Sequence, residues 1–413
     1  MLRLLQALGT YDQIVWQKSP QLILVDQSKS TTMQFRALPA PLHLFPTLLN
    51  VPQLTTADLL SNGRVLWQIL RLTEQKILEL DGLNAEQHLR KMGVSERAID
   101  WFWRTAAMTI TNTPLDICSA GALFRFVRFL SGRDDFLFGF AGIGLGDLFT
   151  PAAARRISAD GGQVLWLRTV SNLMVDNGAV TGVELADGKQ LHASTVIAAV
   201  PPDELAKFIP TAWPDRHECF AHLHQFKPSP YICTYLWFAD KLTHEPFWTK
   251  VWTPDNLNYD FYDLTNIKPS LAGKPSLIAS NCMHSVKFAA LSDEEIVFRT
   301  RAEIVEYLPA AARSEILHSR VHRIPMGIVR STPGIEARRP NSTTPITGFY
   351  LAGDWINTGL PSSMESAARS GWLAAEQVLA AAGKPCSLAQ PLPDLTGLAK
   401  KVAQFSKRHH FTR

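Results

Sequence analysis

The fold is decided by the stretch Tyr350-Leu351-Ala352-Gly353-Asp354-Trp355-Ile356-Asn357-Thr358-Gly359-Leu360-Pro361-Ser362-Ser363-Met364-Glu365, which continues through Ser366 to Gly371. It predicts a strand over Phe349–Ala352, a glycine-punctuated loop, and a helix that begins with a capping box of Ser362 and Glu365. The free N–H groups and positive dipole end of such a helix favour an electron-rich or anionic ligand.

One face of this helix carries small side chains. Ala367, Gly371, Ala374 or Ala375, and Val378 recur at helical spacing, so we expect this face to approach a sheet or a bound cofactor closely. A glycine inside a helix costs about 1 kcal/mol relative to alanine. Close packing of the helix against a sheet would by itself offset that cost, so Gly371 alone does not decide between the two partners.

Four phrases of this stretch carry a family resemblance: Leu-Ala-Gly-Asp-Trp at 351–355, Thr-Gly-Leu-Pro at 358–361, Ser-Met-Glu-Ser-Ala at 363–367 and Arg-Ser-Gly at 369–371. Together they resemble the C-terminal FAD-binding motif of the flavin amine oxidase and phytoene desaturase superfamily. The tryptophan after Gly-Asp, the Thr-Gly-Leu-Pro step and the proline-rich phrase at 38–46 are most similar to one branch, the squalene-associated FAD-dependent desaturases or hydroxysqualene dehydroxylases.

The resemblance implies FAD as the cofactor and assigns residues to it. The Asp354 carboxylate would bind the ribityl or phosphate part of FAD, and the backbone around Met364 and Glu365 would face the pyrimidine edge of the flavin. That edge gathers negative charge on reduction, which a helix N-terminus stabilises. The backbone at Val170 would lie against the adenine end. Gly353 and Pro361 complete the cofactor-binding set.

Composition excludes several classes of protein. The formal charge of +4 over 413 residues gives no argument for nucleic acid binding, and no run of 18 or more apolar residues predicts a membrane span. Five cysteines without a Cys-x-x-Cys pair favour a reducing, cytoplasmic location. We expect no metal at His222 and His224, because no partner stands at ligand spacing. The basic tail from Lys400 is a solvated end or a contact to the inner membrane surface.

Hydrophobic periodicity predicts elements along the whole chain. The predicted helices are 2–8, 56–71, 84–92, 96–109 with Ser95 as N-cap, 116–130, 151–159 and 293–308. The predicted strands are 13–17, 21–26, 32–36, 163–168, 170–176, 179–185, 189–193, 231–239 and 276–280. Two hairpins turn at Asn177-Gly178 and Asp187-Gly188. The apolar run 195–200 predicts a fully buried parallel strand.

These elements predict a mixed α/β (α+β) chain with the two-domain FAD-dependent amine-oxidase-like fold. We assign 1–150 mostly to the substrate domain, with its start inside the FAD domain, and 206–325 to the substrate domain. Residues 151–205, which include a β-meander, and 326–385, which include the C-terminal motif, are assigned to the FAD domain, and 386–413 to a tail.

The superfamily begins with a strand, Gly-x-Gly-x-x-Gly and a helix, which bind the pyrophosphate. The only near match, Gly142-x-Gly144-x-Gly146, has Asp147 where the third glycine is needed. We therefore expect an FAD domain that is incomplete at its N-terminus, weak FAD binding by this chain, and an open slot in the sheet beside 195–200.

The branch implies a long apolar isoprenoid as substrate, with hydride transfer from reduced flavin to hydroxysqualene as water leaves. The Phe-rich segment 121–149 and a group of aromatic residues are interpreted first as core and alternatively as the wall of a long apolar cavity, which we expect them to line in part; the aromatic group is Trp248, Trp252, Tyr259, Phe261 and Tyr262. No spacing identifies the catalytic proton donor. The alternatives are a carotenoid desaturase of the phytoene type, and a chain that binds apolar lipid without holding FAD.

Overall fold

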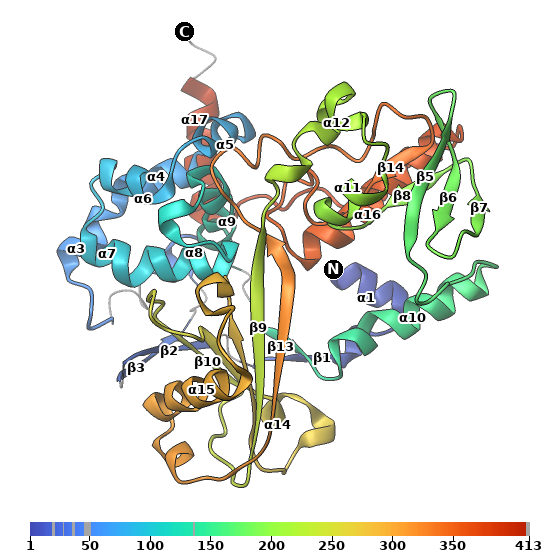
Figure 1. Cartoon of the computed structure of the whole chain (residues 1–413). Coiled ribbons are helices and arrows are strands. Elements are labelled where there is room, and N and C mark those ends of the chain that lie inside the picture. Colours follow the sequence, from blue (N-terminus) through green and yellow to red (C-terminus); the bar gives the residue numbers. More distant parts are fainter. Residues whose placement is uncertain (19–20, 28, 35–37, 45–50, 135–136, 410–413) are drawn as a thin grey trace.

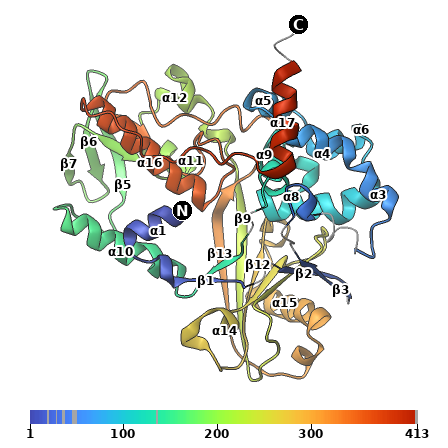
Figure 2. The same ribbon diagram turned by 180° about the vertical axis from the view of Figure 1, so that it is seen from behind.

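The computed structural model describes residues 1–18, 21–27, 29–34, 38–44, 51–134 and 137–409. Three parts are visible from opposite sides in Figures 1 and 2: a helical lobe, a large sheet below it, and a lobe around a pair of parallel strands. We call the last of these the parallel-strand lobe. The chain crosses between the parts several times, and the predicted domain boundaries stay a prediction.

The large sheet has seven strands in the order β13-β9-β12-β11-β10-β2-β3. Neighbouring strands are antiparallel, except that β10 and β2 are parallel. The strands are β2 (Gln21–Asp26), β3 (Lys29–Gln34), β9 (Pro228–Phe238), β10 (Phe247–Lys250), β11 (Asp260–Asp263), β12 (Leu277–Cys282) and β13 (Ile316–Val329). The predicted strands at 21–26, 231–239 and 276–280 are thereby confirmed within two or three residues at each end.

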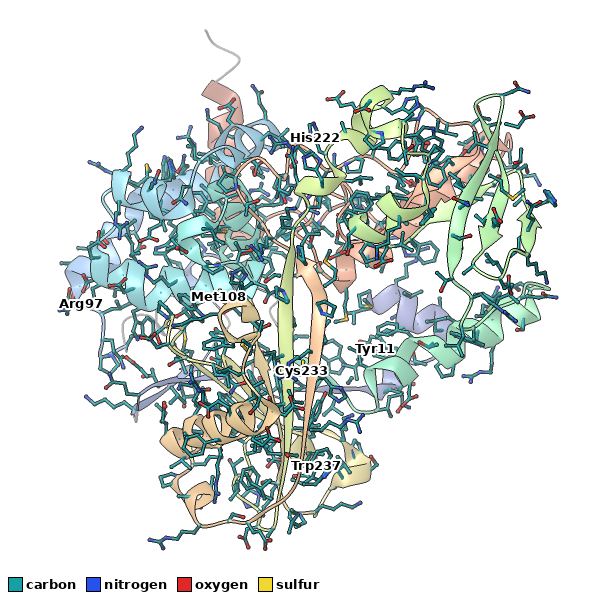
Figure 3. The ribbon with its side chains drawn as sticks, viewed as in Figure 1. Tyr11, Arg97, Met108, His222, Cys233 and Trp237 are labelled. Atoms are coloured by element: carbon teal, nitrogen blue, oxygen red, sulfur yellow. The ribbon has the colours of Figure 1, made fainter. Side chains whose placement is uncertain are left out.

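The two faces of the large sheet differ in burial. On β9, Ile232, Leu236 and Phe238 are at most 1% exposed and belong to the core beneath α15 (Asp293–Tyr307), which confirms the predicted helix. The alternate residues are only half-buried: Tyr231, Cys233, Tyr235 and Trp237. Successive side chains of a strand point to opposite faces, so these four lie on the face away from α15, which we call the open face. Figure 3 labels Cys233 and Trp237 along β9.

The helical lobe is built from short amphipathic helices around one apolar core. It comprises α3 (Thr56–Ser61), α4 (Gly63–Leu70), α5 (Glu74–Asp81), α6 (Ala85–Lys91), α7 (Glu96–Ala98), a π-helical turn at Ile99–Trp103, α8 (Arg104–Thr111), α9 (Ala120–Gly132) and, from the C-terminal segment, α17 (Gly397–His409). Ser95 caps α7 as predicted, its side chain accepting from the N–H of Ala98 at 3.2 Å. The single helix predicted at 56–71 is wrong, because the chain is interrupted at Asn62.

The backbones of α9 and α5 approach each other closely at Gly121. A methyl group at Gly121 would lie 2.4 Å from the carbonyl oxygen of Ile77 and 2.8 Å from the backbone nitrogen of Asp81. We expect Gly121→Ala to lower the free energy of unfolding by about 2–4 kcal/mol, because neither backbone can yield without opening the core. Chemical denaturation measures this change.

Gly63 in α4 provides the matched control, since nothing lies within 4 Å of a methyl group built there. Gly63→Ala should be neutral or raise stability by up to about 1 kcal/mol, through helix propensity alone. Equal effects of the two substitutions would show that the α5–α9 contact does not limit side-chain size.

The parallel-strand lobe pairs β8 (Val196–Ala198) with β14 (Phe349–Leu351) and adds the antiparallel sheet β5 (Val170–Asp176), β6 (Ala179–Leu185) and β7 (Gln190–His192). Its helices are α11 (Pro202–Phe208), α12 (Trp213–Arg216), α13 (Glu218–Ala221) and α16 (Met364–Ala381). The predicted parallel strand and β-meander are confirmed. The strand predicted at 163–168 is wrong: Leu167 has φ 56° and is fully exposed, so this apolar run has no layer to pack against.

The expectation that the 195–200 strand is fully buried is also wrong. Ile197 is 44% exposed, and within the described ranges β8 pairs only with β14. A central strand of an α/β sheet is covered on both faces and paired on both edges. Within the described ranges, β8 instead has one edge without a paired strand, and its apolar side chain Ile197 is exposed. This agrees with the open slot expected beside 195–200.

The opening segment forms α1 (Leu2–Leu8), as predicted, and lies beside α10 (Leu145–Ala159) below the parallel-strand lobe (Figure 2). β1 (Ile14–Trp16) then pairs with β4 (Gly139–Ala141). The ring centroid of Phe140 on β4 lies 5.1 Å from that of Phe247 on the large sheet. No helix in the described part of the chain is long and apolar enough to cross a bilayer.

Candidate functional site

The site is organised by the loop that follows β14. Trp355 is 1% exposed, its indole N–H donates to the carbonyl oxygen of Val200 at 2.9 Å, and its ring meets Phe226 edge-on at 5.4 Å. The N–H of Gly353 donates to the Ser370 hydroxyl of α16 at 2.7 Å. The loop is therefore anchored both to the chain beyond β8 and to α16, which are far apart in the sequence.

The backbone carbonyl of Asp354 is the acceptor on which the loop and the helix start converge. It accepts hydrogen bonds from Arg339 Nη1 at 3.0 Å, from the Ser362 hydroxyl at 3.1 Å and from the Ser366 hydroxyl at 3.3 Å. Burial raises the pKa of the Asp354 carboxyl, and the nearby Arg339 guanidinium acts against this rise. The structure thus brings the predicted residues Gly353, Asp354 and Pro361 together at the start of α16.

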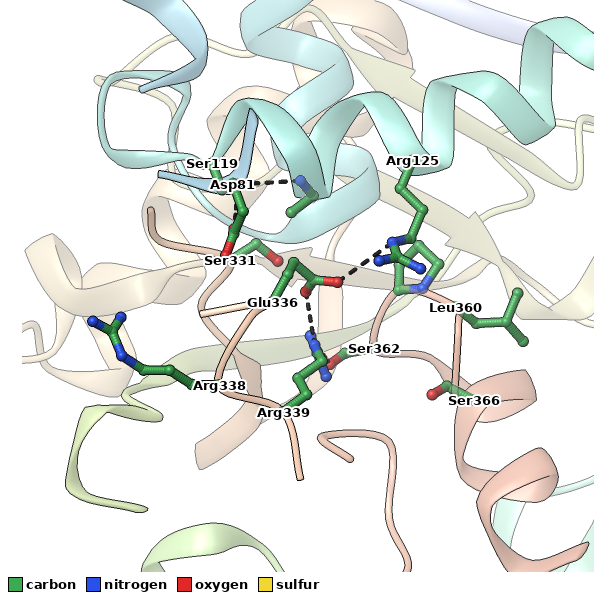
Figure 4. A network of polar contacts seen from close by, with 12 residues as sticks. Asp81, Ser119, Arg125, Ser331, Glu336, Arg338, Arg339, Leu360, Ser362 and Ser366 are labelled. Carbon is green, nitrogen blue, oxygen red and sulfur yellow. Dashed lines mark hydrogen bonds and ion pairs between the residues drawn. The ribbon is translucent and has the colours of Figure 1, made fainter. Parts of the chain in front are cut away.

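A buried chain of ion pairs holds this loop to the helical lobe (Figure 4). Arg339 Nε lies 2.7 Å from Glu336 Oε1, and Arg125 Nε of α9 lies 3.5 Å from Glu336 Oε2. Arg125 also contacts Glu74 of α5 at 2.5 Å. Arg125, Glu336 and Arg339 are 4%, 6% and 7% exposed. Sequence reasoning missed this network, whose only local signal is the three-residue spacing of Glu336 and Arg339.

A second buried carboxylate, that of Asp81, holds the 331–340 segment against the helical lobe. Asp81, at the end of α5, accepts from the Ser119 hydroxyl at 2.7 Å and from the N–H of Ala337 at 3.0 Å. Its pKa is raised by burial, and the Ser119 hydrogen bond opposes the rise. The 331–340 segment is therefore fixed to the helical lobe on both sides of Glu336 (Figure 4).

The predicted capping box of α16 is wrong in its residues. Ser363, not Ser362, caps the helix, accepting from the N–H of Ser366 at 3.2 Å. Ser362 cannot cap because its hydroxyl is buried between Asp354 and Arg339. Glu365 forms an ion pair with the amino group of Met1, and Met364 is 57% exposed. Met364 nevertheless lies near Asp354, because the hydroxyls of Ser362 and Ser366, on either side of Met364, both donate to the backbone carbonyl of Asp354.

The buried stripe of α16 is shifted by one residue from the predicted one. Ser366, Ser370 and Ala374 are buried, whereas Ala367 and Gly371 are exposed and a methyl group at Gly371 would meet nothing within 4 Å. Serine hydroxyls that bond the loop decide which stripe turns inward. The Ala367–Gly371 stripe beside the helix start is a smooth, side-chain-poor surface, which fits the flat ring of a flavin.

Val170 lies apart from the other predicted cofactor residues. It is the first residue of β5, partly exposed and paired with Leu185 of β6. The β5–β7 sheet touches the β8–β14 region through a bridge between Ala179 and Thr347. The structure thus places Val170 on the β5–β7 sheet and Asp354 in the loop after β14 of the same lobe, and their assignment to the two ends of FAD stays a prediction.

The predicted substrate-lining aromatics are divided between core and open face. Trp248 and Phe261 are fully buried and stack at 5.1 Å in the core under α15, so the expectation that they line a cavity is wrong. Phe124 is likewise buried, in the helical lobe. Tyr262 lies on the other side of β11 and meets Phe140 at 6.3 Å. The aromatic surface therefore belongs to the open face.

Two hollows lie outside the open face. One of about 770 Å³ on the helical lobe is lined mainly by polar side chains of α4 and α5, among them Arg64, Gln68 and Lys76. Another, of about 280 Å³, lies between the helical lobe and the large sheet beside Trp252 and His284. Burial lowers the pKa of His284 to about 4, so this imidazole is neutral at neutral pH.

Known proteins resemble this chain in sequence and in fold. The chain is 25% identical over 392 residues to the 15-cis-phytoene desaturase of Solanum lycopersicum, covering 90% of this chain and 66% of that protein. It is 24% identical over 396 residues to the 15-cis-phytoene desaturase of Synechococcus elongatus, covering 92% and 83%. An oxidoreductase structure from Methanosarcina mazei superimposes with a TM-score of 0.65 at 18% identity, covering 89% of this chain and 82% of that one, which shows the same fold.

The family described as flavin containing amine oxidoreductase matches residues 1–379. This range includes the β14 loop, the start of α16 and the buried network that holds them together. The family implies a flavin cofactor, and the exposed stripe at the start of α16 fits its ring. The chain belongs to the flavin containing amine oxidoreductase family.

Proposed function

We propose that this chain is an FAD-dependent oxidoreductase of a long isoprenoid that reductively dehydroxylates hydroxysqualene to squalene for hopanoid synthesis. The Gly-Asp-Trp and Thr-Gly-Leu-Pro steps at 353–361 support this branch of the family. Relatives named for phytoene support a long isoprenoid substrate. The chain spans 66% of the tomato relative's length.

The observation that carries the dehydroxylation is the set of polar groups on an otherwise aromatic open face. Tyr231, Tyr262 and Asn281 are only partly buried, and Tyr262 is backed by Asp260, whose carboxylate accepts its hydroxyl at 2.8 Å. Tyr262 and Asn281 are hydrogen-bonded within the fold, whereas the Tyr231 hydroxyl has no partner among the described residues. A hydrocarbon placed here would cover that hydroxyl without pairing it, which costs about 1–3 kcal/mol. A substrate that carries a hydroxyl group pairs with it.

Each part of the site then has a role. Bound FAD, when reduced, supplies the hydride. The Asp354 loop and the start of α16 hold the ribityl and ring ends of the cofactor, and the ion-pair network keeps that loop in register. Aromatic faces of the open face stabilise positive charge that grows on the allylic carbon as the C–O bond breaks.

A carotenoid desaturase is the second candidate, and the phytoene desaturase relatives favour it. The same surfaces would hold a polyene whose desaturation removes a hydride from an allylic methylene group, with oxidised flavin as acceptor, and a proton from the neighbouring carbon, which passes to water or a base. The two activities differ in the direction of electron flow and in whether the substrate carries a hydroxyl.

One pair of assays separates these activities. Under anaerobic conditions with FAD and dithionite, we expect hydroxysqualene to be converted to squalene, as measured by gas chromatography with mass spectrometry. With FAD and a quinone acceptor instead, phytoene should be recovered unchanged. Desaturated phytoene without any squalene would contradict the dehydroxylase and support the second candidate.

We expect this 413-residue chain to bind FAD weakly, with a Kd above about 1 μM, because its sequence contains no Gly-x-Gly-x-x-Gly turn to hold the pyrophosphate. Titration followed by flavin fluorescence measures the affinity. A protein purified with stoichiometric absorbance at about 450 nm would contradict this expectation. Complete absence of flavin binding together with binding of apolar lipid would instead support a lipid-binding module.

We also propose a cytoplasmic location with peripheral contact to the membrane surface. Lys400 and Lys401 are exposed on α17, which packs against α4, and α4 carries the half-exposed Trp67 under the guanidinium of Arg71 at 5.2 Å. Basic side chains beside an exposed tryptophan favour an anionic lipid surface.

A further inference from the structure

Tyr231 differs from the other aromatic residues of the open face in what its ring touches. It lies directly against Gly327 of β13, where a methyl group would stand 2.6 Å from the ring. Gly327 falls in the irregular part of β13, where the register with β9 shifts between Ile324 and Ile328. Any larger residue at 327 would displace the ring, so this glycine sets the position of Tyr231.

The hydroxyl of Tyr231 has no partner among the described residues. The neighbouring phenols are engaged: Tyr262 donates to Asp260 at 2.8 Å, and Tyr259 bonds Thr109. Tyr231 is only half-buried. Among the described side chains, its hydroxyl is not one of the polar atoms that are fully buried without a hydrogen-bond partner. It is therefore a polar group held in place but not used within the fold.

The pKa of Tyr231 keeps its hydroxyl in the protonated, donating form. Burial raises its pKa, and negative charge on Asp260, Cys233 and Asp354 raises it further. Asp260 lies in the large sheet, and Asp354 lies in the loop that follows β14. At neutral pH the hydroxyl keeps its proton and can donate a hydrogen bond.

We propose that the Tyr231 hydroxyl donates a hydrogen bond to the hydroxyl oxygen of a long, otherwise apolar substrate and thereby holds the hydroxyl-bearing carbon beneath the Asp354 loop. The proposal rests on the proposed function, because only that reaction requires a hydroxylated substrate. Tyr231 lies near the start of β9, five residues after Phe226, whose ring meets Trp355 of the Asp354 loop at 5.4 Å. On the same face, the half-buried ring of Trp237 offers aromatic surface to the hydrocarbon chain.

A binding experiment tests this contact without turnover. Quenching of tryptophan fluorescence is measured on the full chain with a twenty-carbon allylic isoprenoid alcohol and with the matching hydrocarbon. We expect the wild-type protein to bind the alcohol about five- to tenfold more tightly, the worth of one hydrogen bond. Tyr231→Phe should abolish the preference, and Gly327→Ala should weaken it by displacing the ring.

Tyr235→Phe is the matched control, because Tyr235 lies on the same strand and face but packs against His322 at 5.8 Å, and Asp354 does not contribute to its pKa shift. It should keep the preference for the alcohol. A Tyr231→Phe variant that melts like the wild type and still prefers the alcohol would overturn the proposal. So would a wild-type protein that binds both ligands equally.

Turnover separates this contact from the proposed function. A wild-type protein that prefers the alcohol but forms no squalene would remove the dehydroxylation and leave the Tyr231 contact standing. If squalene forms and Tyr231→Phe produces it with unchanged kcat/KM, the contact is overturned while the function stands. We expect at least a tenfold loss of kcat/KM in Tyr231→Phe.

Discussion

Replacing Arg339 by methionine is expected to lower the free energy of unfolding by about 3–5 kcal/mol, the cost of removing one partner of a buried ion pair. Within the described part of the chain, Glu336 then keeps only the 3.5 Å contact to Arg125 as an ion pair. Arg339 pairs with Glu336 at 2.7 Å and also donates to the Asp354 carbonyl and the Ser362 hydroxyl. Methionine is of similar length but has no donors, so all three contacts are lost. Urea unfolding followed by circular dichroism measures the change.

Two further variants show whether the uncompensated charge is the cause. Arg339→Met combined with Glu336→Leu should recover part of the loss, because it removes the buried carboxylate that has lost its closer counter-charge, while Arg125 keeps Glu74. Arg156→Met breaks the exposed pair with Asp160 on α10 and should change stability by less than about 0.5 kcal/mol. If Arg339→Met were as mild as Arg156→Met, the network would not be what holds the Asp354 loop.

Asp260→Asn is expected to stabilise the protein by about 3 kcal/mol at pH 8 and by less than about 1 kcal/mol at pH 4, from a shift of about two pKa units. Burial raises the pKa of Asp260 from 3.8 to about 6, although hydrogen bonds from Tyr262 and Asn281 oppose the rise. Between these values the folded protein holds a proton that the unfolded chain has lost. Stability contributed by this group therefore falls as the pH rises through that window.

Thermal or urea unfolding of the variant and the wild type from pH 4 to pH 8 measures the difference, in which other titrating groups cancel. Asp160→Asn, on the exposed end of α10, serves as the control and should show no such trend. A variant that is destabilised equally at both ends of the range would mean that the carboxylate is needed for its hydrogen bonds and is not strained by burial.

Local patterns sufficed for much of the fold. Ser95 was predictable as a cap, the Asn177-Gly178 turn as a hairpin, and 293–308 as a helix, because each depends on residues within one or two turns of each other. The Asp354 loop was predictable for the same reason, since a strand, a glycine loop and a helix start are contiguous. Helix α5, Glu74–Asp81, was not predicted, because its weak apolar pattern becomes a buried face only against α9.

The errors at the site have a shared physical cause. Ser362 and Ser363 are equally good caps by sequence. The choice between them depends on Arg339, which lies outside the helix and donates a hydrogen bond to the Ser362 hydroxyl. The stripe of α16 that turns inward is decided by hydroxyl bonds from Ser366 and Ser370 to the loop. Neither partner is visible in a pattern of hydrophobicity.

Contiguous residues carry the family motif, the helix that presents its N-terminus to the Asp354 loop, and the strand that becomes β9. Three features depend instead on contacts between distant segments: Trp248 and Phe261 face α15, the Tyr231 ring rests on Gly327, and an ion-pair network joins Arg125, Glu336 and Arg339. The reason is that periodicity reports whether a side chain is buried, whereas the identity of its partner depends on which distant segments close around it.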